Sequence, residues 1–212
     1  MLKINEIFFS IQGESSLVGH PTVFIRTSGC HLRCTYCDTT YAYYEGRKLG
    51  FDEILAEVQK YPARHVCVTG GEPLLQKESL ELMAKLCDLG YSVSLETSGD
   101  LSCEEVDPRV RKVIDVKTPD SGEPGRFDLK NLKLKDVNSE FKFVICSEKD
   151  FYWSENFLKE NDLNSGACVY YSPSHGQIEP RWLAEKILKE KSTARLQLQL
   201  HKYIWSADTR GV

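Results

Sequence analysis

The fold of this chain is decided by residues 65–97, HVCVTGGEPLLQKESLELMAKLCDLGYSVSLET. Residues 65–69 are mostly β-branched or apolar, as in a buried strand, and residues 91–97 show a second extended run. Between the two runs, apolar side chains recur at helical spacing before Gly90, at Leu82, Met83, Leu86 and Leu89. A strand, a helix and a strand in succession form a βαβ unit, whose two strands are parallel.

The same alternation extends over most of the chain. Further β-branched or aromatic runs stand at 22–27, 112–117, 140–146, 168–172 and 195–201. Other helical patterns begin after Asp52, occupy 153–161 and begin at Pro180. Roughly six βα units fit, whereas a closed eightfold barrel takes about 250 residues. The sequence therefore predicts an α/β protein with a partial, open parallel β/α barrel; a flat doubly wound sheet is the second choice.

Composition limits the classes of function. The 212 residues carry a formal net charge of -4, and 41% are hydrophobic, which suits one globular domain spanning 1–212. An acidic balance argues against a broad basic surface for nucleic acid. No apolar run approaches the ~18 residues that cross a bilayer, and the first residues do not resemble a signal peptide. We therefore expect a cytoplasmic protein that contacts neither nucleic acid nor membrane directly.

Cysteine is unusually frequent, with eight residues in the chain. Cys30, Cys34 and Cys37 lie close together, while the others mostly occupy apolar runs and are expected to be small buried hydrophobes. In a reducing compartment a tight cysteine cluster indicates metal or redox chemistry. Three thiolates on an iron–sulfur cubane leave one iron open to a small molecule. A zinc site completed by His31 or a distant cysteine is the alternative.

The unusual motifs follow predicted strands. The cysteine segment follows 22–27, and Gly70-Gly71-Glu72-Pro73 follows 65–69. Later strands end at 96–99 (ETSG), 117–119 (KTP) and 172–173 (SP). Because ligands bind at the carboxyl ends of parallel strands, we expect these motifs to share one site. Two glycines allow close backbone approach, and Glu72 can accept a hydrogen bond from a ligand ammonium.

Three cysteines spaced as Cys30-x3-Cys34-x2-Cys37 and followed by a Gly-Gly-Glu-Pro turn resemble the radical S-adenosylmethionine (SAM) superfamily. The resemblance implies a [4Fe-4S] cluster held by the three cysteines, within a cluster loop at 29–40. The open iron of that cluster would bind the amino and carboxylate groups of SAM. One-electron reduction would then cleave SAM to methionine and a 5′-deoxyadenosyl radical.

Further segments narrow the resemblance. They are EIFFSIQGE at 6–14, FIRTSGC at 24–30, CDT at 37–39, ETSG at 96–99 and HKY at 201–203. Together they resemble the 7-carboxy-7-deazaguanine synthases over essentially the whole chain. That family converts 6-carboxy-5,6,7,8-tetrahydropterin to 7-carboxy-7-deazaguanine and releases ammonia, in 7-deazapurine (queuosine) biosynthesis. The resemblance also implies Mg²⁺, a homodimer, and a reductant such as flavodoxin or ferredoxin.

Residue roles follow from these matches. The implied substrate-binding residues are Ile11, Gln12, Gly13, Glu14, Arg26, Thr97 and Val212. The implied SAM-binding residues are Tyr36, Asp38, Gly71, Glu72, Gly99, Lys142, Ser172 and Pro173. Thr39 matches the Mg²⁺ ligand, with substrate oxygens and water completing the octahedron. No protein residue is expected to start the reaction, because the SAM-derived radical takes the hydrogen from substrate C6.

Two other functions remain open from the sequence. A radical SAM activating enzyme, which makes a glycyl radical on a partner protein, would share the cluster and the small size. The pairing of residues 12–14 with Arg26 and Thr97 favours a small pterin over a protein substrate. A zinc-stabilised binding module is the second alternative. For Arg26 itself, the ordinary interpretation is a salt bridge within the strands, because a buried guanidinium needs a partner.

Overall fold

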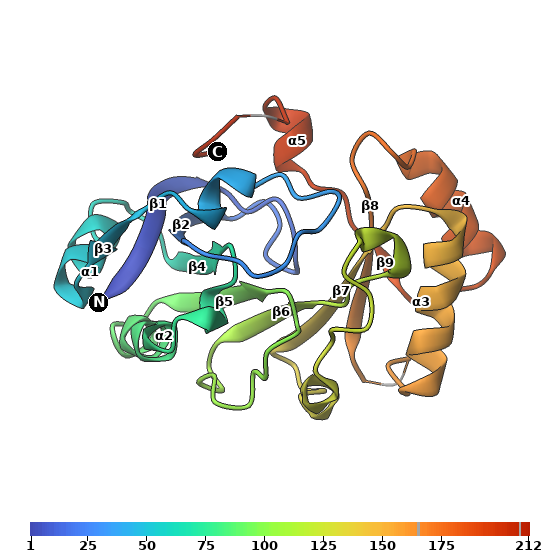
Figure 1. Ribbon diagram of the computed structural model, residues 1–212, viewed down its shortest axis with the longest axis horizontal. Helices are drawn as coiled ribbons and strands as arrows, with labels where there is room; N and C mark the ends of the chain where they lie inside the picture. Colours follow the sequence, from blue (N-terminus) through green and yellow to red (C-terminus); the bar gives the residue numbers. More distant parts are fainter. Residues whose placement is uncertain (165, 208) are drawn as a thin grey trace.

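The computed structural model describes residues 1–164, 166–207 and 209–212, which form one mixed sheet with the strand order β3-β1-β2-β4-β5-β6-β7-β8-β9 (Figure 1). β1 (Leu2–Ile11) pairs antiparallel with both β2 (Pro21–Thr27) and β3 (Arg47–Leu49). From β2 onward every pairing is parallel. The remaining strands are β4 (His65–Gly70), β5 (Ser92–Thr97), β6 (Arg111–Asp115), β7 (Ser139–Ile145), β8 (Cys168–Pro173) and β9 (Arg195–Leu196). The predicted parallel strands are confirmed except for most of the last one, and the sheet is open.

The predicted helices are present as α1 (Phe51–Val58), α2 (Glu78–Asp88), α3 (Glu148–Glu160) and α4 (Pro180–Lys189). α3 begins earlier than predicted because the Ser147 side chain accepts a hydrogen bond from the amide of Asp150 and caps the helix. A short α5 (His201–Ile204) follows β9. Within the described residues, the β5–β6 and β6–β7 connections contain no α-helix, and the second has 3₁₀ turns at Pro119–Ser121 and Leu129–Lys133.

The last predicted strand, 195–201, was wrong beyond Leu196, although Arg195-Leu196-Gln197-Leu198-Gln199-Leu200 alternates strictly. β8 ends at Pro173, which has no amide hydrogen to offer a longer partner strand. The chain instead turns to the loop after β1, where the Leu200 amide donates to the Gly13 carbonyl at 3.0 Å. His201 then begins α5.

The two faces of the sheet differ in chemistry because successive side chains of a strand point to opposite faces. In β2, Val23 and Ile25 join the hydrophobic core, together with apolar residues of α1, α2, α3 and α4. Phe24 and Arg26 point the other way. The register places Arg26 beside Thr69 of β4 in the parallel pairing. The same face carries Glu96 of β5, Asp115 of β6 and Lys142 of β7. Buried charges are costly unless they are paired, so a sheet face that carries several of them is the expected place for a binding site.

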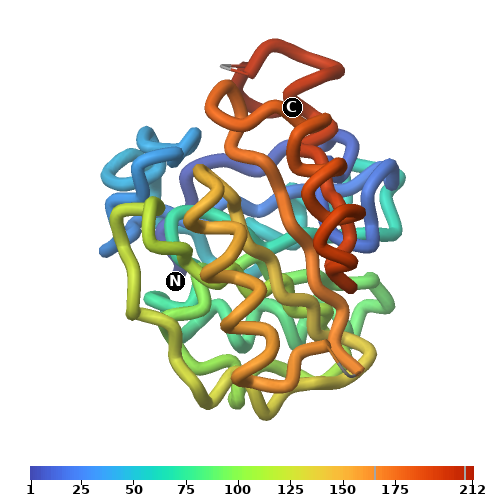
Figure 2. The backbone as a smooth tube through the Cα atoms, turned by 90° about the vertical axis from the view of Figure 1, so that its right-hand side faces the viewer, coloured from blue at the N-terminus to red at the C-terminus, as the bar shows by residue number. Residues whose placement is uncertain are grey.

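Figures 1 and 2 show how the chain covers this second face. α5 and the C-terminal residues cross the top of the molecule in both views, apart from α3 and α4, which lie beside β7 and β8. α2 lies against β5, and α3 against β7. In the part of the chain that the structure describes, no helix is both long enough and apolar enough to span a membrane.

Candidate active site

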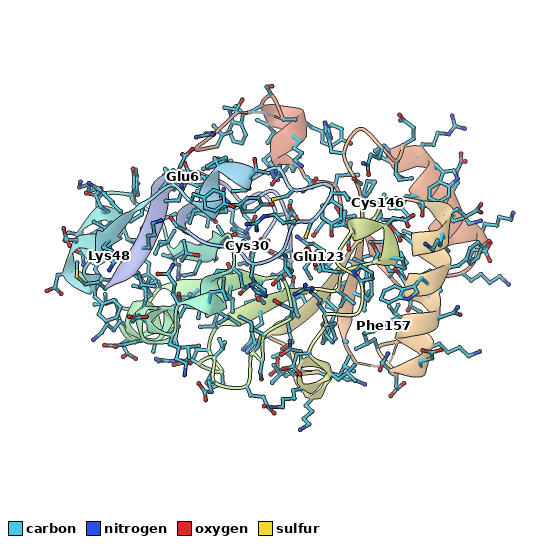
Figure 3. The ribbon with its side chains drawn as sticks, in the orientation of Figure 1. Glu6, Cys30, Lys48, Glu123, Cys146 and Phe157 are labelled. Carbon is cyan, nitrogen blue, oxygen red and sulfur yellow. The ribbon has the colours of Figure 1, made fainter. Side chains whose placement is uncertain are left out.

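A cavity of about 720 Å³ lies along the charged face and opens toward the carboxyl ends of the parallel strands. Its apolar wall includes the rings of Phe8 and Phe24, which stack with centroids 4.9 Å apart. The cysteine segment, the loop after β1 and the C-terminal segment form the other walls. Figure 3 shows Cys30 between Glu6 of β1 and Glu123 of the β6–β7 connection in that view. The cavity therefore joins segments from both ends of the chain.

The three clustered cysteines line this cavity as free thiols. Their loop rests on the Gly-Gly-Glu-Pro turn, since the Glu72 amide donates to the Gly29 carbonyl at 2.7 Å. A Cβ on Gly71 would overlap that same carbonyl and would lie 3.0 Å from the Cβ of Cys30. Glycine is therefore required at position 71 for the turn to support the cysteine loop.

Burial disfavours ionisation of two thiols in this loop, those of Cys30 and Cys34. Burial raises the pKa of Cys34 to about 11, and burial also raises the pKa of Cys30, while the nearby Lys117 ammonium opposes both shifts. Metal binding must therefore displace thiol protons. Among the described residues, no group of three or more His, Cys, Asp or Glu side chains is placed to hold a single metal ion.

Glu72 is fully buried and accepts four hydrogen bonds from the protein. Its Oε1 accepts from the Leu74 amide at 2.9 Å and the Thr97 hydroxyl at 2.8 Å. Its Oε2 accepts from the Ser98 amide at 2.7 Å and the Ser98 hydroxyl at 2.5 Å. These bonds join the turn after β4 to the end of β5. Glu72 does not reach the cavity surface, so its predicted contact with SAM stays a prediction.

The other predicted site residues fall into two groups, those that line the cavity and those that do not. Gly99, Ser172 and Pro173 also lie outside the cavity lining, and the chain reaches the cavity beyond β8 at Ser174 and His175. The remaining predicted SAM, substrate and metal residues line the cavity: Ile11, Gln12, Gly13, Glu14, Arg26, Cys30, Cys34, Tyr36, Cys37, Asp38, Thr39, Gly71, Thr97, Lys142 and Val212. The structure thus brings together one set of side chains that are far apart in the sequence.

The loop after β1 crosses the charged face. The Gln12 side chain accepts from the Glu14 amide at 3.2 Å, which folds the loop back on itself. The Glu14 side chain accepts from Gln199 Nε2 at 3.0 Å. A Cβ on Gly13 would overlap the His201 ring, so this close approach requires glycine. The polar edge formed by Gln12 and Glu14 is thereby fixed before a ligand arrives.

Lys142 is the centre of the buried charges in the cavity. Its Nζ lies 2.8 Å from Glu14 Oε2, 3.6 Å from Glu96 Oε2 and 3.8 Å from Asp115 Oδ2. Burial alone would raise the pKa of Glu14, but the Lys142 ammonium, the nearby His201 and the hydrogen bonds from Lys142 and Gln199 together outweigh burial and hold that pKa at about 2. Asp115 pairs with Lys117 at 3.0 Å. The cavity therefore holds fixed charges of both signs, suited to a ligand with donors and acceptors on its edge.

Arg26 lines the cavity and also forms the salt bridge that the sequence left open. Its Nε donates to Glu6 Oε1 at 2.8 Å, so the strand salt bridge is present. Its guanidinium also lies 5.6 Å from the Phe8 ring centroid and 5.9 Å from that of Tyr41. Within the described residues, neither Nη atom has a protein hydrogen-bond partner. The planar fork is therefore held in place while two donors remain for a carboxylate.

Thr39 sits beside a carboxylate that stays ionised. Its hydroxyl donates to Asp38 Oδ1 at 2.9 Å, and Lys202 Nζ lies 2.6 Å from Asp38 Oδ2. Burial would raise the pKa of Asp38, but the Lys202 ammonium and these hydrogen bonds hold it at about 2. Because the hydroxyl hydrogen points to Asp38, the lone pairs of the Thr39 oxygen are directed elsewhere and can act as a hard ligand for a cation.

Sequence reasoning assigned no role to several residues of the cavity, although some lie within motifs that it singled out. Glu96, Asp115 and Lys117 line it, as do Gln199 and Lys202. One signal could have found the first three, because each is a charged residue within or directly after an apolar strand. The last two carry no such signal, since their place depends on the path of the chain after β9.

Comparison with known proteins identifies the family of this chain. The sequence pattern described as Radical SAM superfamily matches residues 24–121. The 7-carboxy-7-deazaguanine synthase of Chlorobaculum tepidum is 45% identical over 214 residues, covering 100% of this chain and 97% of that protein. The chain belongs to the 7-carboxy-7-deazaguanine synthase family. The Koribacter versatilis protein of that name is 42% identical and is covered completely, as is this chain.

A solved structure supports the same assignment. The crystal structure described as QueE from Escherichia coli superimposes with a TM-score of 0.78 and 26% identity, covering 94% of each chain. Membership of the synthase family brings a [4Fe-4S] cluster and SAM as cofactors. The free thiols of the cysteine loop fit such a cluster, because they face the cavity without disulfides. The glycyl-radical activating enzyme is not favoured, since relatives matching the whole chain carry the synthase name.

Proposed function

We propose that this chain is a radical SAM enzyme that converts 6-carboxy-5,6,7,8-tetrahydropterin to 7-carboxy-7-deazaguanine with release of ammonia, in 7-deazapurine (queuosine) biosynthesis. One observation carries the proposal. A single cavity joins the three free cysteines to Arg26 and to the polar loop 12–14. Family membership over the full chain agrees with it.

The chain's own residues bind and orient the substrate. The two free Nη groups of Arg26 suit the pterin carboxylate, while Gln12 and Glu14 suit the donors and acceptors of the pterin edge. Ile11, Gly13, Thr97 and Val212 would complete the wall around the ring.

SAM would lie between the cysteine loop and the ends of the later strands, against Tyr36, Asp38, Gly71 and Lys142. Four of the predicted SAM residues lie outside the cavity lining and would support the residues that contact SAM: Glu72, Gly99, Ser172 and Pro173. The chemistry that cluster and SAM supply when bound is a carbon radical able to take a hydrogen atom from the pterin. The protein would contribute positioning and exclusion of water, and the C-terminal segment forms part of the cavity wall.

We further propose Mg²⁺ at Thr39, with pterin oxygens and water as its other ligands. Residues 1–212 would act as one radical SAM domain, with the cluster loop at 29–40 and with a second copy as homodimer partner. The electron would come from a flavodoxin or ferredoxin. These statements rest on the family resemblance and on the position of Thr39 in the cavity wall.

An anaerobic turnover assay tests the proposal. Reconstituted, reduced protein is incubated with SAM, Mg²⁺ and the carboxypterin, and both ammonia and the absorbance of the deazapurine are followed. We expect equal amounts of both products, and neither from the Cys34→Ala variant. SAM cleavage that yields no deazapurine would overturn the assignment. We expect the protein to be brown, and we expect metal analysis to find four irons per chain rather than zinc.

A further inference from the structure

Three of the carboxylates that line the cavity, Glu14, Glu96 and Asp115, lie around Lys142, and Glu96 has the weakest ionic partner of the three. Glu14 lies 2.8 Å from Lys142, and Asp115 lies 3.0 Å from Lys117. Glu96 Oε2 is 3.6 Å from Lys142, and Glu96 Oε1 is 3.5 Å from Gln12 Nε2. Two ammonium groups thus face three carboxylates, so the set is electrically neutral when one carboxylate holds a proton. The position of Glu96 makes it that carboxylate.

The surroundings of Glu96 agree with this arrangement. Lys142 of β7 favours the ionised form of Glu96. The carboxylates of Glu14, of Asp115 on β6 and of Glu140 on β7 oppose it, and Cys67 of β4 adds a buried neutral thiol. Burial and these carboxylates together outweigh Lys142 and raise the pKa of Glu96 to about 7. Glu96 can therefore exchange a proton near neutral pH while Lys142 and Glu14 stay charged.

If the proposed function is correct, the last steps of the reaction need a group that can give up a proton and take one back. Release of ammonia breaks a carbon–nitrogen bond, and the electron pair leaves with the nitrogen, which takes up a proton. Aromatisation removes one proton from a ring carbon, and the electrons of that carbon–hydrogen bond form the new ring double bond. The two proton transfers balance, so one carrier that gives and then regains a proton is sufficient.

We propose that Glu96 is this proton carrier. As a carboxylic acid it protonates the departing amino nitrogen, and as a carboxylate it then takes the proton from the ring carbon. Glu96 begins and ends the cycle in the same state. Lys142 is a positioning residue for it, because its ammonium holds Glu14 ionised and leaves Glu96 as the carboxylate that titrates.

The Glu96→Gln variant of the cluster-loaded enzyme tests the proposal, since glutamine has nearly the same size and cannot titrate. With pterin deuterated at C6, we expect deuterium to pass into 5′-deoxyadenosine and SAM at close to the wild-type rate. Ammonia and deazapurine formation should fall about 10²–10⁴-fold, the usual contribution of general acid–base catalysis. Exposed Glu104→Gln is the matched control, with both rates unchanged.

A pH profile separates this role from a structural one. In the wild type, the rate of ammonia release should fall as pH rises through about 7, because Glu96 then loses the proton that the nitrogen needs. Glu96→Gln should lack this fall, and Glu96→Asp should restore it with part of the rate. Wild-type product formation by Glu96→Gln would overturn the proposal, as would parallel loss of deuterium transfer. Failure of the proposed function is distinguishable, because wild-type enzyme would then make no deazapurine.

Discussion

Replacing Arg26 by lysine tests how the cavity recognises the substrate. The Arg26 guanidinium uses Nε for Glu6, at 2.8 Å, and keeps two Nη groups for a carboxylate. A lysine ammonium can occupy one of these places but not both, since it is a point charge without the planar fork. Losing one charge-assisted hydrogen bond costs about 1.5–3 kcal/mol. We therefore expect kcat/KM for the pterin to fall roughly 10- to 150-fold, at about 1.4 kcal/mol for each factor of ten.

The assay is anaerobic steady-state turnover with pterin and SAM varied separately. The expected change lies in the pterin dependence, while the KM for SAM stays within about twofold, because the cysteine loop is untouched. Arg109→Lys is the control, as that exposed arginine pairs with Asp107 far from the cavity lining. Equal weakening of SAM and pterin would refute the reasoning, and so would an unchanged pterin dependence.

Three further predictions concern the metal sites and the turn after β4. Cys34→Ala should abolish cluster assembly, measured as iron per chain, while Cys87→Ala keeps full iron content. Thr39→Ala should raise the Mg²⁺ concentration needed for half-maximal turnover and Thr39→Ser should do so less; identical Mg²⁺ titrations would remove Thr39 from the site. Glu72→Gln should lower the free energy of unfolding by about 1–3 kcal/mol, since its amide must face one buried backbone N–H. Exposed Glu78→Gln should leave the urea midpoint in place, and a Glu72→Gln midpoint equal to wild type would contradict the four-bond description.

The parallel strands and the main helices could be predicted from the sequence because their patterns are local. Residues 65–97 contain a whole βαβ unit, and its helix and strands appear as expected. β3, with three residues at the sheet edge, is too short to show a period. The alternating run after Arg195 was misleading, because the chain leaves the sheet for contacts with residues near Gly13 that no local pattern encodes.

The candidate site could be predicted where a motif carries it. The cysteine spacing and the Gly-Gly-Glu-Pro turn indicated the right end of the sheet, and Arg26 proved to face the cavity. What the motif could not show is the internal use of Glu72, which depends on a neighbouring strand. Nor could it show that Glu96 and Lys142 face each other, since their contact follows from the order of strands in the sheet.

The joining of the first loop to the end of β9 has a consequence for how the enzyme is made in the cell. Ribosomes add about 5–20 residues per second, so the roughly 160 residues between Cys37 and Leu200 take on the order of ten seconds to appear. During that interval the cysteine loop exists without Gln199 and the Gly13 contact that complete the cavity. The pocket around the cysteine loop can therefore be completed only after the chain has been made as far as Leu200.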